Sequence, residues 1–358
     1  MRSKRIPVVA AFIIKARKLN SMPTVSVIIT SHNRPRLLGA AIESARAAGR
    51  DVEVVVVDDA STDETADTCR KFSDVRYVRI ERNQRVAGAR NIGILNSSGE
   101  FITFLDDDDR RISGSLELQS EALAGSPTAG LIYAQSLVVD QRGLPTGDYN
   151  PRRAPQGNVF WELLCRNFIP CGTALFRRSC LFRVGMLDQS VPGIDDWDLW
   201  IRISAHYDVM ALEKPVLLWR RSTPASRQGT SRAHALVAMS TRHFHEKWLK
   251  LRPAVEASVE MRQEAWRRFS KQMAGHLSLE TARALKYGQF RRARKNMMAA
   301  LRLHPRASVR VATSASTFRL MVAIAKEHLF GHRSPTSIEN ERTNHEDYNL
   351  QGTVSRTN

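Results

Sequence analysis

The strongest constraint on the fold is a regular alternation of short apolar runs and helical segments between residues 22 and 110. Four runs have the composition of buried strands, and they are residues 24–30, 52–57, 75–80 and 101–105. Segments of helical composition lie between them, at residues 36–48 and 87–96. A further helix is expected to end at about residue 72, with Ser61 or Thr62 as its N-cap. Strands and helices that alternate with short connections predict a mostly parallel sheet wrapped by helices.

Polar clusters follow three of these predicted strands, at the point where each strand ends. They are Thr30 to Arg34, Asp58-Asp59 and Asp106 to Asp109. In open sheets of this kind, ligands bind outside the carboxyl ends of the strands. We therefore expect the three clusters to converge on one edge of the sheet and to form the functional site.

Four consecutive aspartates directly after a buried strand are costly, because like charges repel at close range. A hard divalent cation would relieve the repulsion, and Mg²⁺ usually takes one or two carboxylates plus phosphate oxygens. Asp106 and Asp108 have the one-residue spacing that lets two side chains face the same way from an extended chain. The run predicts a metal–diphosphate site, and the alternative is a solvated turn with an acidic helix cap.

A second acidic pair, Asp195-Asp196, opens a predicted helix over residues 195–205. Negative charge at a helix N-terminus is stabilising in itself, which is one interpretation of the pair. Beside a metal–diphosphate site, the pair becomes a candidate general base, which must lie within hydrogen-bond reach of an acceptor hydroxyl.

Several classes of protein are excluded by what the sequence lacks. Neither a Gly-x-Gly-x-x-Gly motif after the first strand nor a Gly-Lys-Ser/Thr phosphate loop occurs, which removes the usual dinucleotide and P-loop interpretations. Four irregularly spaced cysteines do not form a disulfide scaffold or a zinc finger. The longest apolar run near the start, residues 7–14, is too short to span a bilayer, so a multi-span membrane protein is excluded.

The remainder of the chain is less regular. We expect strands at residues 131–139 and 173–177 and a helix at 159–164. Residues 231–330 have a helical pattern throughout, and residues 287–305 resemble one tetratricopeptide-like unit, which would have to pack on something. Residues 332–358 are polar and predict disorder. The predicted regions are a basic segment at 1–21, a folded unit at 22–226, a basic helical extension at 227–331 and this tail.

The net charge of +18 is concentrated outside the folded unit. Residues 1–21 carry +6 and residues 227–310 carry +14, whereas residues 22–226 carry −2. Such basic appendages are typical of contact with nucleic acid or an anionic membrane surface. We expect residues 1–21 to be an amphipathic anchor or to precede the true start, and not a secretory signal.

The aromatic residues of the helical extension favour a membrane over nucleic acid. Phe244, Trp248, Trp266 and Phe269 have spacings that suit a helical core, not an aromatic platform for bases. We therefore expect no nucleic-acid partner and a peripheral contact with anionic lipid. The alternative for the basic extension is a solvated helical face.

Taken together, five motifs resemble the inverting nucleotide-sugar transferases of glycosyltransferase family 2. They occur in the family's order at residues 25–34, 56–63, 87–91, 99–109 and 195–202. The resemblance covers about residues 22–226 and implies an α/β GT-A fold, a Rossmann-like, mostly parallel sheet flanked by helices, here followed by an all-helical extension.

The resemblance also implies roles for individual residues. The nucleotide sugar would be bound by Thr30, His32, Arg34, Asp58, Asn83, Arg90, Asp106 and Asp107. Asp58 would bind the base, and His32 stands where the family usually has Tyr, although an ordinary loop role for His32 is equally open. Asp106 and Asp108 match the Asp-x-Asp motif that holds Mg²⁺ or Mn²⁺. Asp196 matches the catalytic base, with Asp195 where Glu is commoner, and Asp188 matches a position upstream of the acceptor loop.

Three departures from the family pattern bear on function. Arg85 stands where a small residue usually follows Asn83, which bears on the contact expected of Asn83. The Gln-x-x-Arg-Trp motif of processive synthases is absent, which indicates transfer of one or a few sugars. Residues 219–222 replace an aromatic-Arg-x-His segment, so no histidine role is expected there.

The predicted function is inverting transfer of a sugar from a nucleotide-diphosphate donor, most commonly UDP in the family, to a glycan or lipid-linked acceptor. The expected setting is cell-envelope or exopolysaccharide synthesis, in the cytoplasm or peripherally at the inner face of the membrane. The alternative is a non-catalytic nucleotide- or glycan-binding protein on the same fold. The sugar, the acceptor and the oligomeric state are left open by the sequence.

Overall fold

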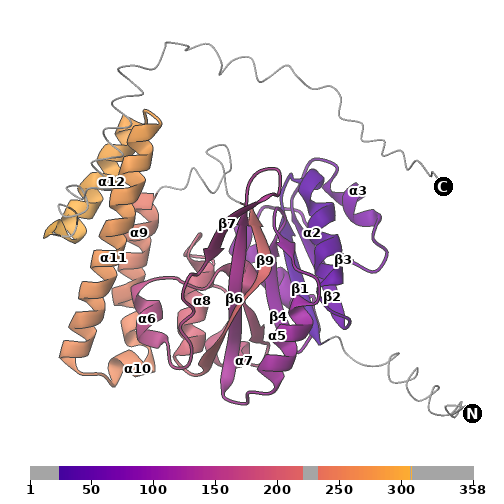
Figure 1. Cartoon of the computed structure of the whole chain (residues 1–358), viewed down its shortest axis with the longest axis horizontal. Helices are drawn as coiled ribbons and strands as arrows, with labels where there is room; N and C mark the ends of the chain where they lie inside the picture. The colour runs from indigo at the N-terminus through magenta and orange to yellow at the C-terminus, as the bar shows by residue number, and fades with distance from the viewer. Residues whose placement is uncertain (1–23, 221–232, 307, 309–358) are drawn as a thin grey trace, which may run out of the picture.

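The computed structural model describes residues 24–220, 233–306 and 308 (Figure 1). The predicted basic segment at 1–21 and the predicted tail at 332–358 therefore lie outside the described residues, as do residues 309–331 of the predicted helical extension. The described chain forms one mixed sheet with helices on both faces and a group of long helices beside it (Figure 1).

The first half of the sheet is parallel, as the alternation predicts. Its strands are β1 (Val25–Ser31), β2 (Val52–Asp59), β3 (Arg76–Ile80) and β4 (Phe101–Asp106), in the order β3-β2-β1-β4. The connecting helices are α2 (Pro35–Ala47), α3 (Thr65–Arg70) and α4 (Arg85–Leu95). In this register Ser31 lies beside Asp58 and Thr30 beside Asp106, so the polar strand ends meet at one edge.

The start of α3 differs from the prediction. The helix begins at Thr65 without a side-chain cap, so neither Ser61 nor Thr62 is its N-cap. Both residues make other hydrogen bonds: the Ser61 backbone N–H donates to Asp58 Oδ1 at 2.8 Å, and the Thr62 N–H donates to Asn33 Oδ1 at 2.8 Å. The loop before α3 is thus held by the first two polar clusters, and the helix starts later.

The second half of the sheet mixes strand directions. Beyond β4 lie β8 (Leu175–Arg177), β6 (Ala129–Val139), β9 (Asp208–Arg220) and β5 (Arg110–Arg111), and β7 (Pro145–Asn150) pairs with β6. Only the β6–β9 pair in this half is parallel among the described strands. Short helices connect them, namely α5 (Ser115–Ala124), α6 (Phe160–Cys165), η1 (Cys171–Thr173), α7 (Cys180–Val184) and α8 (Asp195–Ser204).

Each face of the sheet covers its own hydrophobic core, because side chains of successive strand residues point to opposite faces. Ile29 and Val56 lie in the core beneath α2 and α5, together with Leu38 of α2. Ile28 and Phe104 lie in the other core, beneath α4 and α8. Strands that are apolar on both faces fit this burial between two helical layers.

The helical region contains α9 (Ala233–Glu246), η2 (Trp248–Lys250), α10 (Arg252–Val255), α11 (Val259–Lys286) and α12 (Phe290–Leu303). The helical pattern expected from residue 231 is therefore confirmed over the described part of the extension. α11 and α12 form a hairpin whose turn contains Gly288 at φ +67°, a backbone conformation that glycine adopts at low cost. Within residues 24–220 and 233–308, no helix combines the length and the apolar character that crossing a membrane requires.

Aromatic packing joins this helical region to the sheet. Phe244, Trp248 and Phe269 are fully buried, and the Phe244 and Phe269 ring centroids lie 4.7 Å apart. Trp197 of α8 lies 5.0 Å from Trp248 by the same measure, so the core of the sheet continues into the helices. The core role predicted for these aromatic side chains is confirmed.

A polar junction at Asp198 reinforces this packing. The Asp198 carboxylate accepts hydrogen bonds from His243 Nε2 at 2.9 Å, Trp248 Nε1 at 2.9 Å and Arg202 Nε at 2.8 Å. Burial alone would raise the pKa of Asp198, but these bonds outweigh burial and lower it. Removing one partner of such a buried charged group is strongly destabilising. These bonds to Asp198 therefore fix the helical region against α8.

We expect Phe269→Ala to lower the free energy of unfolding by about 3–5 kcal/mol, since it leaves a cavity among four other aromatic side chains. Phe290→Ala is the matched control, because Phe290 is exposed and an exposed change usually stays within about 0.5 kcal/mol. Urea denaturation followed by tryptophan fluorescence measures both values. Equal stabilities of the two variants would contradict a shared core.

Candidate active site

The three polar clusters lie together at the carboxyl edge of the parallel strands. They border a cleft of about 220 Å³, lined by Thr30, Ser31, His32, Arg34, Asp59, Asn83, Arg85, Val86, Ala89, Asp106 and Asp107. The lining comes from β1, β2, the loop before α4, α4 itself and the end of β4. This is the edge at which open parallel sheets bind ligands.

The four-aspartate run forms the acidic wall of this edge. Oxygen atoms of Asp106, Asp108 and Asp109 all lie within 4.8 Å of one another. The one-residue spacing predicts that Asp106 and Asp108 face the same way. Asp109 is an additional member of the cluster that this spacing does not indicate. Carboxylate oxygens are the ligands that hard divalent cations prefer, so the donor set suits Mg²⁺ or Mn²⁺.

Burial makes this run electrostatically expensive. Desolvation raises the pKa of Asp107 to about 7 and the pKa of Asp108, with repulsion from neighbouring aspartates adding to both. The pKa of Asp109 is also raised well above its usual value for the same reasons, although its Oδ1 accepts the Arg220 backbone N–H at 2.8 Å. A cation at this position would offset the charge that the fold concentrates here.

Arg34 already provides part of that compensation. Its Nη1 lies 3.1 Å from Asp107 Oδ1 and 3.0 Å from Asp108 Oδ2. Ser31 Oγ donates to the other Asp107 oxygen at 2.8 Å. The Asp107 carboxylate is therefore held by the protein on both oxygens, while Asp108 shares one oxygen with Arg34.

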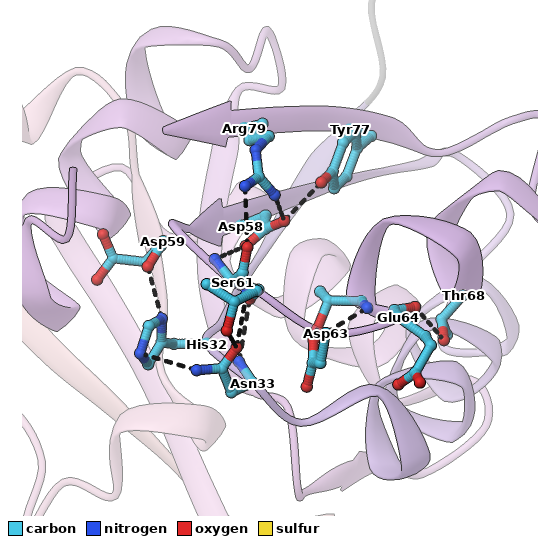
Figure 2. Close-up of polar contacts among 12 residues, drawn as sticks. His32, Asn33, Asp58, Asp59, Ser61, Asp63, Glu64, Thr68, Tyr77 and Arg79 are labelled. Atoms are coloured by element: carbon cyan, nitrogen blue, oxygen red, sulfur yellow. Dashed lines mark hydrogen bonds and ion pairs between the residues drawn. The ribbon is translucent and has the colours of Figure 1, made fainter. Parts of the chain in front are cut away.

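Asp58 and Asp59 face opposite sides of β2, as consecutive strand residues do. The fully buried Asp58 carboxylate accepts the Tyr77 hydroxyl at 2.5 Å, Arg79 Nη1 at 3.0 Å and the Ser61 N–H (Figure 2). Burial alone would raise the pKa of Asp58, but hydrogen bonds from Ser61 and Tyr77 and the Arg79 charge lower it. Asp59, not Asp58, lies among the residues that line the cleft, and its Oδ1 accepts the Gln84 N–H at 2.6 Å.

His32 and Asn83 converge on the backbone of Asp59. His32 Nδ1 donates to the Asp59 carbonyl at 2.7 Å (Figure 2). Asn83 Nδ2 donates to the same oxygen at 3.2 Å. Asn83 Oδ1 also accepts the N–H of Arg85, which has φ +61°. A non-glycine residue with positive φ is held by its surroundings and is typical of a functional loop. The unexpected Arg85 thus takes part in shaping the cleft.

Arg90 connects the acidic wall to the second acidic pair. Its Nη2 lies 3.0 Å from Asp106 Oδ1 and its Nη1 lies 3.1 Å from Asp195 Oδ2. Burial alone would lower the pKa of Arg90, but the acidic groups around it, Cys171, Asp106 and Asp195, outweigh burial and raise it. The guanidinium also stacks over the Phe104 ring, 5.0 Å from its centroid. Arg90 therefore fixes the distance between the two sets of carboxylates.

The pair at the start of α8 has two different environments. Asp195 accepts the Gly193 N–H at 3.2 Å and pairs with Arg90, so both of its oxygens are used. Asp196 has one bond, from the Trp197 N–H at 2.6 Å, and keeps part of its surface exposed. Desolvation, with repulsion from Asp195, raises the pKa of Asp196 to about 7. A carboxylate with a pKa near neutrality suits a general base.

One residue around the site, Arg220, is visible only in the fold. Arg220, at the end of β9, binds the acidic turn through its backbone N–H and through Nε, which donates to the Asp108 carbonyl at 3.1 Å. Its place in the sequence gives no signal of this contact. Asp188 accepts the Ser190 N–H at 2.8 Å and closes a turn before α8.

Comparison with known proteins identifies the family. A profile described as "Glycosyl transferase family 2" matches residues 26–183. An Escherichia coli protein named UDP-Glc:alpha-D-GlcNAc-diphosphoundecaprenol beta-1,3-glucosyltransferase WfaP is 30% identical over 188 residues, which cover 51% of this chain and 70% of that protein. The chain belongs to glycosyltransferase family 2. The predicted enzyme class, a glycosyltransferase, is thereby confirmed.

Two further comparisons extend this result. The E. coli protein WfgD, which carries the same descriptive name as WfaP, is 29% identical over 193 residues, which cover 52% of this chain and 72% of that protein. Among solved structures, the mannosyltransferase PcManGT from Pyrobaculum calidifontis, described in complex with GDP-Man and Mn²⁺, has a TM-score of 0.50 at 20% identity, covering 91% of this chain and 95% of that one. The predicted GT-A fold with a helical C-terminal region is confirmed by this likeness.

We expect Tyr77→Phe to destabilise the protein by about 1–3 kcal/mol at pH 7, because a buried carboxylate loses a hydroxyl donor. The lowered pKa of Asp58 contributes stability above its unfolded-state value, and that contribution is lost as the pH falls through the folded-state pKa. The difference in the free energy of unfolding between the variant and the wild type should therefore shrink towards pH 3. Denaturant titrations at pH 7 and pH 3.5 measure it.

Tyr149→Phe, at an exposed tyrosine, is the matched control and should leave stability within about 0.5 kcal/mol at both pH values. A deficit of Tyr77→Phe that did not depend on pH would contradict the role given to its hydroxyl.

Proposed function

We propose that this glycosyltransferase moves a sugar from a UDP-sugar to a hydroxyl of a lipid-linked glycan, with inversion at the anomeric carbon, in cell-envelope glycan synthesis. The observation that carries the proposal is the Arg90 bridge, which joins the three-carboxylate cluster beside the cleft to the Asp195-Asp196 pair that contains the candidate general base. WfaP and WfgD, whose names specify UDP-Glc and a diphosphoundecaprenol acceptor, support the donor and acceptor classes.

The residues suited to hold a divalent cation are Asp106, Asp108 and Asp109, because their oxygens are grouped and are not all occupied by protein donors. When bound, Mg²⁺ or Mn²⁺ would stabilise the negative charge that develops on the departing nucleoside diphosphate. Arg34 lies against the same carboxylates and would place a fixed positive charge beside the diphosphate. The buried Asp107 carboxylate would keep Arg34 in this position, because it binds both Arg34 and Ser31.

The nucleoside would occupy the cleft formed by Thr30, His32, Asn83 and Asp59. The His32 ring offers a stacking surface, and the Asp59 carboxylate offers an acceptor for an N–H of the base. Asp58 would support this wall through Tyr77 and Arg79, because its own oxygens are occupied.

Catalysis would rest on Asp196 as general base. It would take the proton of the acceptor hydroxyl as that oxygen attacks the anomeric carbon from the face opposite the diphosphate. Because one displacement suffices, no covalent enzyme intermediate forms and configuration inverts. Asp195, paired with Arg90, would orient the start of α8, and its negative charge would help to keep the pKa of Asp196 raised.

In this proposal residues 22–226 bind the substrates and carry out the transfer. The helical region that follows supports α8. A lipid-linked acceptor places the enzyme at the inner face of the membrane, with a peripheral attachment through basic residues. We assign no nucleic-acid partner, since Phe244, Trp248 and Phe269 of the helical region lie in its core.

We expect Asp196→Asn to lower sugar transfer at least about 100-fold, because a general base contributes roughly 10²–10⁴-fold. The affinity for UDP should stay unchanged. The measurement is initial rate with a synthetic lipid-diphosphate acceptor, alongside UDP titration by calorimetry. Asp208→Asn, at an exposed aspartate at the start of β9, is the control and should retain the wild-type rate.

The pH dependence separates a lost base from a distorted site. The raised pKa of Asp196 means that the base is protonated below about pH 7, so the wild-type rate should rise with pH up to that value. The residual rate of Asp196→Asn should lack this rise. A variant that kept near-wild-type transfer would show that Asp196 is not the base.

We expect UDP with Mn²⁺ to raise the melting temperature of the wild-type protein and not of Asp108→Asn, since binding only to the folded state stabilises it by mass action. UDP alone should give a smaller shift. Thermal-shift assays across UDP, GDP and dTDP, each with and without metal, measure the effect. A flat response across the panel from folded protein would contradict a donor site of this kind.

A further inference from the structure

The turn between α11 and α12 is an exposed, strongly basic structure that the transfer chemistry does not use. Residues 281–303 hold seven Lys or Arg residues and no Asp or Glu. α12 packs on α11 through a narrow face of buried residues, Ala293, Asn296 and Ala300. The opposite face and the turn are therefore left to solvent.

Two aromatic side chains stand at the turn. Tyr287, which follows the last residue of α11, is 58% exposed, and Phe290, the first residue of α12, is 67% exposed. Gly288 lies between them, and the Phe290 N–H donates to its carbonyl at 3.0 Å, which closes the turn. A tight turn that presents two aromatic rings to water loses the stabilisation that their burial would give.

The basic residues around these rings outnumber their acidic partners. Glu280 pairs with Arg283 at 2.7 Å and with Arg292 at 3.4 Å. Four other cations, Lys286, Arg291, Arg294 and Lys295, are exposed and have no ion-pair partner among residues 24–220 and 233–308. The turn therefore combines aromatic side chains with uncompensated positive charge.

The turn lies toward the same end of the molecule as the active-site edge, although on the other side of the view in Figure 1. In Figure 1 the chain enters β1 at the lower side of the view, so the carboxyl ends of the parallel strands point upward, and α11 also ends at the upper side. The aromatic turn and the cleft edge thus lie toward the same end of the molecule.

We propose that this turn, Tyr287 and Phe290 with Lys286, Arg291, Arg294 and Lys295, docks on an anionic phospholipid bilayer. The cations meet lipid phosphates, and the aromatic rings enter the boundary between headgroups and acyl chains, where amphipathic and aromatic side chains are stable. The cleft edge then faces the bilayer, so a sugar on a membrane-held diphosphate comes within reach. The value of this orientation rests on the lipid-linked acceptor in the proposed function, whereas the docking itself does not.

A membrane is favoured over an acidic protein or RNA by the mixture of groups. Charge alone would serve a polyanion, and four cations without aromatic rings would suffice for a duplex or an acidic protein. Single-stranded RNA can also stack its bases on exposed rings, so RNA binding is one outcome of the test. The two rings at the tip add an apolar contact that a bilayer accepts without a shaped complementary pocket.

The test is co-sedimentation of the full chain with vesicles of phosphatidylglycerol and phosphatidylcholine, at low and at moderate salt. We expect Tyr287→Ser with Phe290→Ser to weaken binding tenfold or more, since partial burial of two aromatic side chains is worth at least about 1.4 kcal/mol. Phe182→Ser is the matched control: Phe182 is 90% exposed on α7, at the lower end of Figure 1, and its loss should change nothing.

A second measurement reports insertion directly. Phe290→Trp should gain fluorescence that brominated lipids quench, whereas Phe182→Trp should gain fluorescence that they do not quench. Unchanged vesicle binding in the double serine variant, or equal quenching at both positions, would overturn the proposal. The proposal would also be overturned if the double serine variant lost binding to RNA but kept binding to vesicles.

Activity on a short-chain, water-soluble acceptor separates this proposal from the proposed function. The double serine variant should keep the wild-type rate on that acceptor and lose rate only on acceptor embedded in vesicles. If the wild-type chain bound vesicles through the turn yet transferred no sugar to either acceptor, the docking surface would stand and the proposed function would fail.

Discussion

The Arg90 guanidinium, held between Asp106 and Asp195, is the contact on which the active-site edge depends. The fold brings the four-aspartate run and the Asp195-Asp196 pair to one edge, and at close range these groups repel one another. One buried cation that pairs with both sets turns this repulsion into a fixed spacing. Replacing it would leave two carboxylates facing each other across a partly dry space, which costs several kcal/mol.

The remaining acids are compensated from other elements in the same way. Arg34 from the start of α2 holds Asp107 and Asp108, and Arg220 from β9 donates its N–H to Asp109. The edge therefore draws on both halves of the sheet, so the site exists only once the mixed sheet is complete. A resident divalent cation would add to this set of charges and would not have to organise it alone.

The helical region contributes to the same edge from a distance. Asp198 lies two residues after Asp196 and is bonded to His243 and Trp248 of that region. Since α8 is short, fixing Asp198 also fixes the turn that presents Asp195 and Asp196. This explains why the helices share a core with the sheet and are not a separate domain with a core of their own.

Local pattern was sufficient for much of this fold. The parallel strands, their connecting helices and the edge at which Asp106 and Asp108 meet follow from apolar runs that end in polar clusters. β9 could not be predicted in this way, because Glu213, Lys214 and Pro215 interrupt its apolar pattern and its pairing with β6 shifts register nearby. A tertiary pairing decides that strand, and propensity does not.

The site shows the same limit. Whether Asp58 or Asp59 faces the cleft depends on where β2 ends, and the strand runs through both residues. The motif resemblance points to Arg90 as a nucleotide contact, whereas its two ion pairs arise from residues 16 and 105 positions away. Such roles depend on distances across the folded chain, which spacing along the sequence does not contain.

The measurement that tests the central claim most directly is the anomeric configuration of the product, read by proton NMR from the coupling constant of the transferred sugar. With a UDP-α-sugar as donor, a single displacement assisted by Asp196 predicts a β-linked product. An α-linked product would contradict it, because retention requires a second displacement or a different mechanism at this edge.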